Sequence, residues 1–183
     1  MYTNNRFFQI AYSCFIDAKS IKLYSMKKQV NLKITSKQYV ENLKPSGETF
    51  LRELEMEDSL EIMTEGTLYF KNNARYISYE ESLDGESEDT HTLVKIDGKS
   101  LRIRRYDSKT HDDSMDMTLE QGVLNITRYQ VPQLASLDLE IYTNKMEDAL
   151  DEDGYGTVSV DYKIKFDKYY SRRNILEIEV MPS

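Results

Sequence analysis

The chain has 183 residues, and its 24 Lys and Arg against 32 Asp and Glu give a formal net charge of −8. This length corresponds to about one domain, which is large enough to bury an apolar core without disulfides or a structural metal. The acidic balance argues against a nucleic-acid-binding surface. A single Cys and two His argue against a zinc site or a disulfide framework, so we expect a folded domain without a metal or cofactor.

The first apolar segment lies near the start of the chain and is too short to cross a membrane. It runs from Phe7 to Ile16, whereas a membrane-spanning helix needs about 20 apolar residues. No small-residue cleavage signature of an export signal follows it. We therefore expect residues 1–25 to be a weakly structured leader or an over-extended start, and residues 26–183 to form the domain. A single Cys without an export signal favours a cytoplasmic location, with no membrane attachment.

From Met26 onward, apolar and polar residues alternate in short segments separated by turn residues. Val30, Leu32 and Ile34 begin the pattern, which returns about every ten residues to the end of the chain. A period of two at this spacing is typical of antiparallel strands in a barrel or sandwich. The segment 144–154 (NKMEDALDEDG) predicts a short helix. We therefore predict an all-β fold, a single antiparallel β-barrel of about 8–10 strands with one short helix.

Three tight turns predict which residues face each other across the strands. The turns are Asn72-Asn73, Asp97-Gly98 and Gln121-Gly122. They place Gly66 opposite Tyr79, Thr90 opposite Arg105 and Met115 opposite Arg128. All three registers turn the apolar residues towards one common interior face. A one-residue slip at any turn would turn its strand inside out.

Three longer stretches resemble the YwiB-like proteins, uncharacterised bacterial proteins of a domain-of-unknown-function family. The stretches are 61–82 (EIMTEGTLYFKNNARYISYEES), 90–105 (THTLVKIDGKSLRIRR) and 139–164 (LEIYTNKMEDALDEDGYGTVSVDYKI). The resemblance extends from about Met26 to Val180 and departs from the family pattern at RRYDSK, from Arg104, and at QVPQLAS, from Gln130. It implies a calycin-like closed barrel, the architecture of lipocalins and fatty-acid-binding proteins. It implies no catalytic residues.

Six polar residues are predicted to face the mostly apolar interior. They are Thr64, Tyr79, Glu81, Thr90, Arg105 and Arg128. Because an unpaired buried charge is costly, the charged members are expected either to lie at an open rim or to form a buried ion pair. In a second interpretation, the arginines bind the carboxylate or phosphate of a ligand while apolar residues hold its tail.

Two classes of function follow, and we assign no catalytic residues to either. In the first, a monomer or weak dimer binds a small amphipathic or anionic ligand in the barrel lumen. In the second, the lumen is fully packed and the outer surface is a protein-interaction module. Of the two histidines, His91 is predicted on the outer face and His111 in a polar loop. Neither spacing predicts a metal site.

Overall fold

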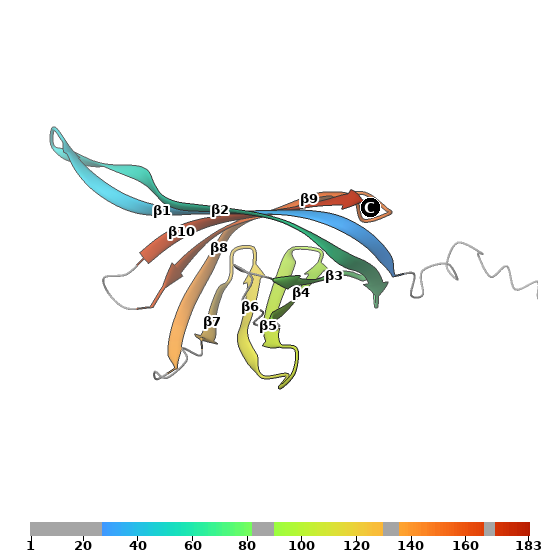
Figure 1. Cartoon of the computed structure of the whole chain (residues 1–183). Helices are drawn as coiled ribbons and strands as arrows, with labels where there is room; N and C mark the ends of the chain where they lie inside the picture. Colours follow the sequence, from blue (N-terminus) through green and yellow to red (C-terminus); the bar gives the residue numbers. More distant parts are fainter. Residues whose placement is uncertain (1–26, 82–89, 130–135, 167–170) are drawn as a thin grey trace, which may run out of the picture.

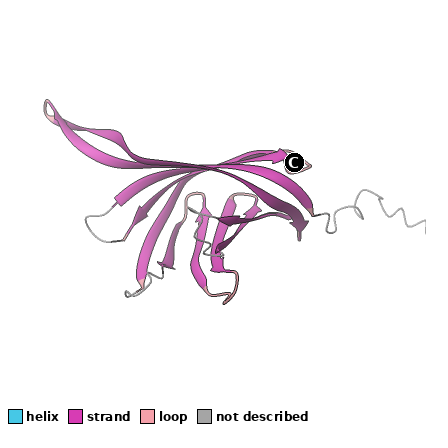
Figure 2. Ribbon diagram, in the orientation of Figure 1, coloured by secondary structure: helices cyan, strands magenta, loops and turns pink. Residues whose placement is uncertain are grey.

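The computed structural model describes residues 27–81, 90–129, 136–166 and 171–183, and all regular structure in these ranges is β-strand (Figure 2). The strands are β1 (Lys28–Ser46), β2 (Thr49–Lys71), β3 (Ala74–Glu81), β4 (Thr90–Asp97), β5 (Ser100–Asp107), β6 (Asp113–Glu120), β7 (Leu124–Tyr129), β8 (Leu137–Leu150), β9 (Gly156–Lys165) and β10 (Ser171–Pro182). They form one antiparallel sheet in the order β6-β5-β4-β3-β2-β1-β10-β9-β8-β7. The all-β, antiparallel prediction is confirmed. The predicted leader, residues 1–25, lies outside the described residues.

The sheet curls until its two edge strands approach each other, as Figure 1 shows below β1 and β2. At the turn after β6, Gly122 donates its backbone N–H to the carbonyl of Thr143 on β8 (2.9 Å), and Thr143 donates to Val123 (3.4 Å). The Asn125 side chain also donates to the Thr118 carbonyl across the two edges (3.1 Å). Within the described ranges, however, β6 and β7 form no ladder. The predicted closed, calycin-like barrel is therefore not confirmed.

The segment predicted as a short helix is instead the second half of β8, followed by a turn. β8 pairs with β9 as far as Leu150 opposite Gly156, and the register shifts between Thr143 and Lys145. This β-bulge keeps Met146 on the buried side. Pairing with β9 and burial of Met146 outweigh the helical propensity of the segment, because tertiary packing routinely overrides such weak preferences.

The apolar core fills the end of the sheet at which the turns 72–73, 98–99 and 121–122 gather, here called the turn end. Leu32, Leu68 and Ile77 are fully buried there. The turn after β8 packs onto the same end, because a Cβ at Gly154 would lie 2.6 Å from a Leu68 side-chain carbon. An ion pair between Arg75 on β3 and Asp148 on β8 spans the curl beside this core.

The predicted registers have different outcomes at the three turns. Gly66 lies opposite Tyr79, as predicted. At the second turn, Asp97 pairs with Ser100, so the loop is one residue further along and the partner of Arg105 is Thr92 instead of Thr90. This two-residue shift leaves every side chain on its predicted face, because side-chain direction repeats every two residues.

The third predicted register is wrong. Gly122 and Val123 bond to β8 rather than continuing a hairpin with β6, so β7 pairs with β8. As a result Thr127 is buried and Ile126 is 70% exposed. The inward face of β7 is thus the opposite of the predicted one.

Candidate functional site

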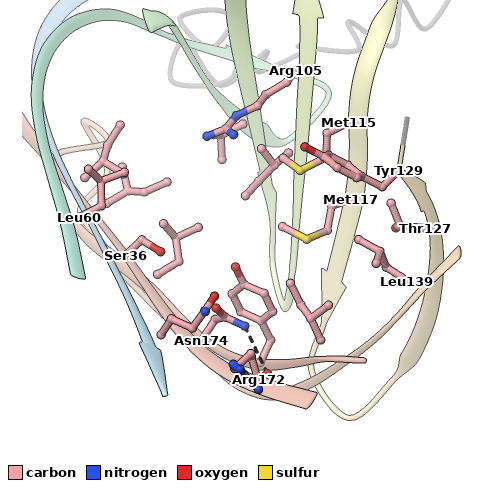
Figure 3. A pocket seen from close by; sticks show the side chains of 18 of the residues that line it. Ser36, Leu60, Arg105, Met115, Met117, Thr127, Tyr129, Leu139, Arg172 and Asn174 are labelled. Atoms are coloured by element: carbon pink, nitrogen blue, oxygen red, sulfur yellow. Dashed lines mark hydrogen bonds between the residues drawn. The ribbon is translucent and has the colours of Figure 1, made fainter. Parts of the chain in front are cut away.

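A cavity of about 590 Å³ lies inside the curled sheet, and side chains from all ten strands line it (Figure 3). Most of the lining is apolar. The apolar members include Ile34, Val94, Ile103, Met115, Met117, Leu139, Ile164 and Ile178. The volume falls within the range of about 300–1,000 Å³ that is typical of small-molecule sites.

The cavity exists because the strands separate away from the turn end. β1 pairs with β2 along its whole length, whereas β3 pairs with β2 only from Gly66 to Lys71. Beyond Gly66, β2 continues without β3 towards Leu60, which lines the cavity together with Tyr129 of β7. The separation leaves space that the inward side chains do not fill. The described residues therefore do not form the fully packed lumen of the second predicted function.

Arg105 brings a positive charge to this mostly apolar wall. It lies on β5 in a cross-strand row with Tyr79, Thr92 and Met115. Its side chain projects from β5 into the cavity (Figure 3). Burial raises the pKa of Tyr162 on β9 to about 12, and the positive charge of Arg105 offsets part of this rise. The guanidinium therefore acts on a hydroxyl group across the cavity.

A second polar group lies on the wall formed by β1 and β10. Arg172 donates from Nη2 to Glu57 (2.9 Å), and Gln38 donates to the other oxygen of the same carboxylate (2.9 Å). The hydrogen bond from Arg172, followed by that from Gln38, lowers the pKa of Glu57. The buried Asn174 donates to the backbone carbonyl of Arg172 (3.3 Å). Arg172 is therefore neutralised by its own ion pair at the wall.

The structure brings two of the six predicted interior residues, Tyr79 and Arg105, to the cavity wall. Thr64 is half-buried opposite Leu32 and lines a separate hollow beside Gly66 and Tyr79 instead of the cavity. Thr90 is half-buried at the start of β4, where its backbone pairs with that of Glu81. The side chain of Glu81 lies outside what the structure describes. Whether any of these residues binds a ligand stays a prediction.

Arg128 does not belong to the interior, and its prediction is corrected. The reversed face of β7 turns its side chain outward, where it is 68% exposed and donates to Asp138 on β8 (3.2 Å). The error comes from assuming that the Gln121-Gly122 turn closes a hairpin between β6 and β7. The cavity residues of β7 are Thr127 and Tyr129 instead.

Asn174 is a cavity residue that the sequence interpretation missed. It is 5% exposed and continues the inward row that contains Leu176 and Ile178. The alternation in the segment NILEIEV carries this signal, because residues two apart on a strand share a face. Extending the row by one step from Leu176 would have identified it.

The outer face holds His91, as predicted. Its Nε2 lies 2.6 Å from the hydroxyl of Ser78, and its ring lies 5.0 Å from that of Tyr106. Among the described residues, no group of three or more His, Cys, Asp and Glu is placed to hold a metal ion. No helix long and apolar enough to cross a membrane occurs in the same ranges.

The fold defines a small antiparallel β-sheet protein with a mostly apolar cavity inside the curled sheet. Residues 48–178 match the family described as "Domain of unknown function (DUF1934)", and the chain belongs to this family. It is also similar to the crystal structure of the ywiB protein from Bacillus subtilis, with a TM-score of 0.50 and 19% identity over 82% of this chain and 92% of that chain. At this identity the likeness shows the fold alone. The resemblance to YwiB-like proteins is thus confirmed, and a search of the curated proteins found no match.

Proposed function

We propose that the protein binds a small amphipathic molecule with an anionic head group in the cavity, without catalysing a reaction. The observation that carries the proposal is a single one: Arg105 projects into a mostly apolar cavity of about 590 Å³. A guanidinium in such surroundings is suited to a carboxylate or phosphate, because it can donate two parallel hydrogen bonds. The calycin-like arrangement expected from the resemblance agrees with a ligand held inside the sheet, and this agreement is an analogy of fold.

The walls supply a complementary environment for the rest of the ligand. Ile103, Met115 and Met117 flank Arg105 on β5 and β6. Each ligand methylene group that these side chains remove from water contributes about 0.8 kcal/mol. The two methionines also adapt to chains of different shape, because the thioether side chain is flexible. The proposed ligand class is therefore a single-chain carboxylate or an organic phosphate with an apolar tail.

The interaction module is the second candidate function, and the same experiment tests it. The experiment is a thermal-shift screen with fatty acids, nucleotides and organic phosphates on the wild type, Arg105→Met and Arg128→Met. The last variant is a matched control, since it makes the same chemical change on the outer face. We expect ligand-dependent stabilisation in the wild type and Arg128→Met, and none in Arg105→Met. No response in any of the three would leave the interaction module as the better account.

A structural role for Arg105 is separated from binding by a double-mutant cycle with Glu81→Gln. If Arg105 only pairs with Glu81, the double variant loses less stability than the sum of the two single variants, and ligands have no effect. If it binds an anion, Arg105→Met abolishes the ligand response while changing stability little. The cycle is measured by chemical denaturation without ligand.

A further inference from the structure

Two neighbouring polar side chains face the cavity from the wall formed by β9 and β10. Tyr162 and Asn174 lie directly opposite each other in the register of these two strands. Both line the cavity, and both are buried, with exposed fractions of 7% and 5%. The register thus places two hydrogen-bonding side chains, here called the polar pair, next to each other in a mostly apolar lining.

Each member of the polar pair has hydrogen-bonding capacity that no described residue uses. Asn174 donates from Nδ2 to the carbonyl of Arg172 (3.3 Å), and nothing in the described ranges donates to its Oδ1. The Tyr162 hydroxyl makes no hydrogen bond to any residue of the same ranges. Neither atom is enclosed by protein, unlike the equally unpartnered hydroxyl of Thr143, which lies opposite Tyr162 on β8. Both atoms therefore border the open space of the cavity.

The polar pair is uncharged. Burial raises the pKa of Tyr162 to about 12, so its hydroxyl keeps its proton at neutral pH and can donate a hydrogen bond. Arg172, two residues before Asn174 on β10, is neutralised by its ion pair with Glu57. The surroundings of the polar pair therefore suit a neutral polar group of a ligand better than a second anionic group.

The polar pair lies across the cavity from Arg105. In the strand order, β10 is five positions away from β5, through β4, β3, β2 and β1. In a ten-stranded sheet whose edges approach each other, five positions are half of the way around. Figure 3 accordingly shows Arg105 and Asn174 on opposite sides of the cavity. A ligand whose head group binds Arg105 can therefore extend its chain to the polar pair.

An entirely apolar tail would be poorly matched to this wall. The Tyr162 hydroxyl and the Asn174 Oδ1 atom hydrogen-bond to water in the absence of a ligand, and a tail that displaces this water without replacing its hydrogen bonds loses affinity. A single hydroxyl group on the ligand satisfies both atoms, because it accepts from Tyr162 and donates to Asn174. A carbonyl group would accept from Tyr162 but would leave the Asn174 oxygen without a donor.

We propose that the ligand is a hydroxylated amphipathic acid, whose hydroxyl group binds Tyr162 and Asn174 while its anionic head group binds Arg105. This inference rests on the proposed function and narrows its ligand class to anions that carry a second, neutral polar group. The polar pair selects among such ligands, since a site that hydrogen-bonds a ligand hydroxyl discriminates against the analogue that lacks it.

Isothermal titration calorimetry with dodecanoate and its 2-, 3- and 12-hydroxy derivatives tests the inference. We expect at least one hydroxy acid to bind the wild type about tenfold more tightly than dodecanoate does. Tyr162→Phe should remove this preference while binding dodecanoate as the wild type does, which shows that the cavity is intact. Asn174→Leu, the second variant, should act in the same way. Tyr142→Phe is the matched control, because it removes a hydroxyl from the outer face of β8, where Tyr142 is 43% exposed, and it should keep the preference.

The failure of this inference is distinguishable from that of the proposed function. A wild type that binds dodecanoate and all three hydroxy acids equally would overturn the inference and leave the proposed function standing. A hydroxyl preference that persists in both Tyr162→Phe and Asn174→Leu would also overturn it, because another group would then be responsible. If the wild type binds none of the four acids, the inference is overturned, and the thermal-shift screen with organic phosphates decides the proposed function separately.

Discussion

Removing the hydroxyl of Tyr162 tests the geometry of the cavity without any ligand. Tyr162 is 7% exposed, and its burial raises its pKa from 10.0 to about 12. A folded-state pKa above the unfolded value contributes stability that is fully present below pH 10 and is lost as the pH rises to 12. One pKa unit corresponds to about 1.4 kcal/mol, so the whole effect is about 2.7 kcal/mol. By pH 11, half of it, about 1.4 kcal/mol, should be lost.

The assay is chemical denaturation of the wild type and Tyr162→Phe between pH 8 and pH 11. Other tyrosines and lysines titrate in this range in both proteins, so the informative quantity is the difference between their free energies of unfolding. We expect this difference to change by about 1.4 kcal/mol against the wild type as the pH rises. In an Arg105→Met background the loss should begin at the same pH but continue to a higher pH, because Arg105 lowers the folded-state pKa of Tyr162. A difference that stays constant from pH 8 to pH 11 would refute a buried Tyr162 facing the cavity.

Three further predictions concern stability. Gly66→Ala should lower the free energy of unfolding by about 1–3 kcal/mol, because the new Cβ would lie 2.9 Å from a backbone carbonyl oxygen; thermal denaturation measures the loss, and a neutral result would contradict the close packing. Arg75→Met should lower the free energy of unfolding in urea by about 1–3 kcal/mol, because it leaves the half-buried carboxylate of Asp148 without its ion-pair partner. An unchanged free energy of unfolding would contradict a structural role for this pair. The hydrogen bond from Arg102 lowers the pKa of Asp116, so the ionised Asp116 contributes stability that is present above about pH 4 and is lost as the pH falls further. Arg102→Met should therefore make the free energy of unfolding depend less on pH below about pH 4. An unchanged pH dependence would contradict the pairing of Arg102 with Asp116.

The periodicity of the sequence predicted most strands because one face of each is buried. Gly66 opposite Tyr79 could be placed from the Asn72-Asn73 turn alone, since both Asn residues adopt the positive φ angles that such a turn requires. At the second turn, the same method missed by two residues yet kept the correct face. Where turn chemistry and burial agree, the sequence therefore determines which side chains face inward.

The failures occur where a distant strand decides the local structure. Nothing near Gln121 indicates that Gly122 will bond to β8, and that contact reverses the face of Arg128. The 144–154 segment has the composition of a helix, but pairing with β9 makes it a strand. Both outcomes depend on residues far away in the sequence, which local patterns do not report.

The cavity and the two-stranded arm formed by residues 39–56 of β1 and β2 could not be predicted for a different reason. In the arm both faces are exposed, so its sequence lacks the regular alternation that burial imposes on a strand. The cavity depends on the position at which the pairing of β3 with β2 ends. Knowing which residues face inward does not reveal that position. Bulky residues such as Met117 and Tyr162 line the cavity, but they do not fill the space between the walls.

Native mass spectrometry of freshly purified protein tests the central claim, ligand binding in the cavity, most directly. We expect the wild type and Arg128→Met to carry additional non-covalent mass, and Arg105→Met to lose it. The same molecule should be released when the protein is denatured. A wild type with only its polypeptide mass, or an Arg105→Met variant that retains the additional mass, would contradict an anionic ligand held by Arg105.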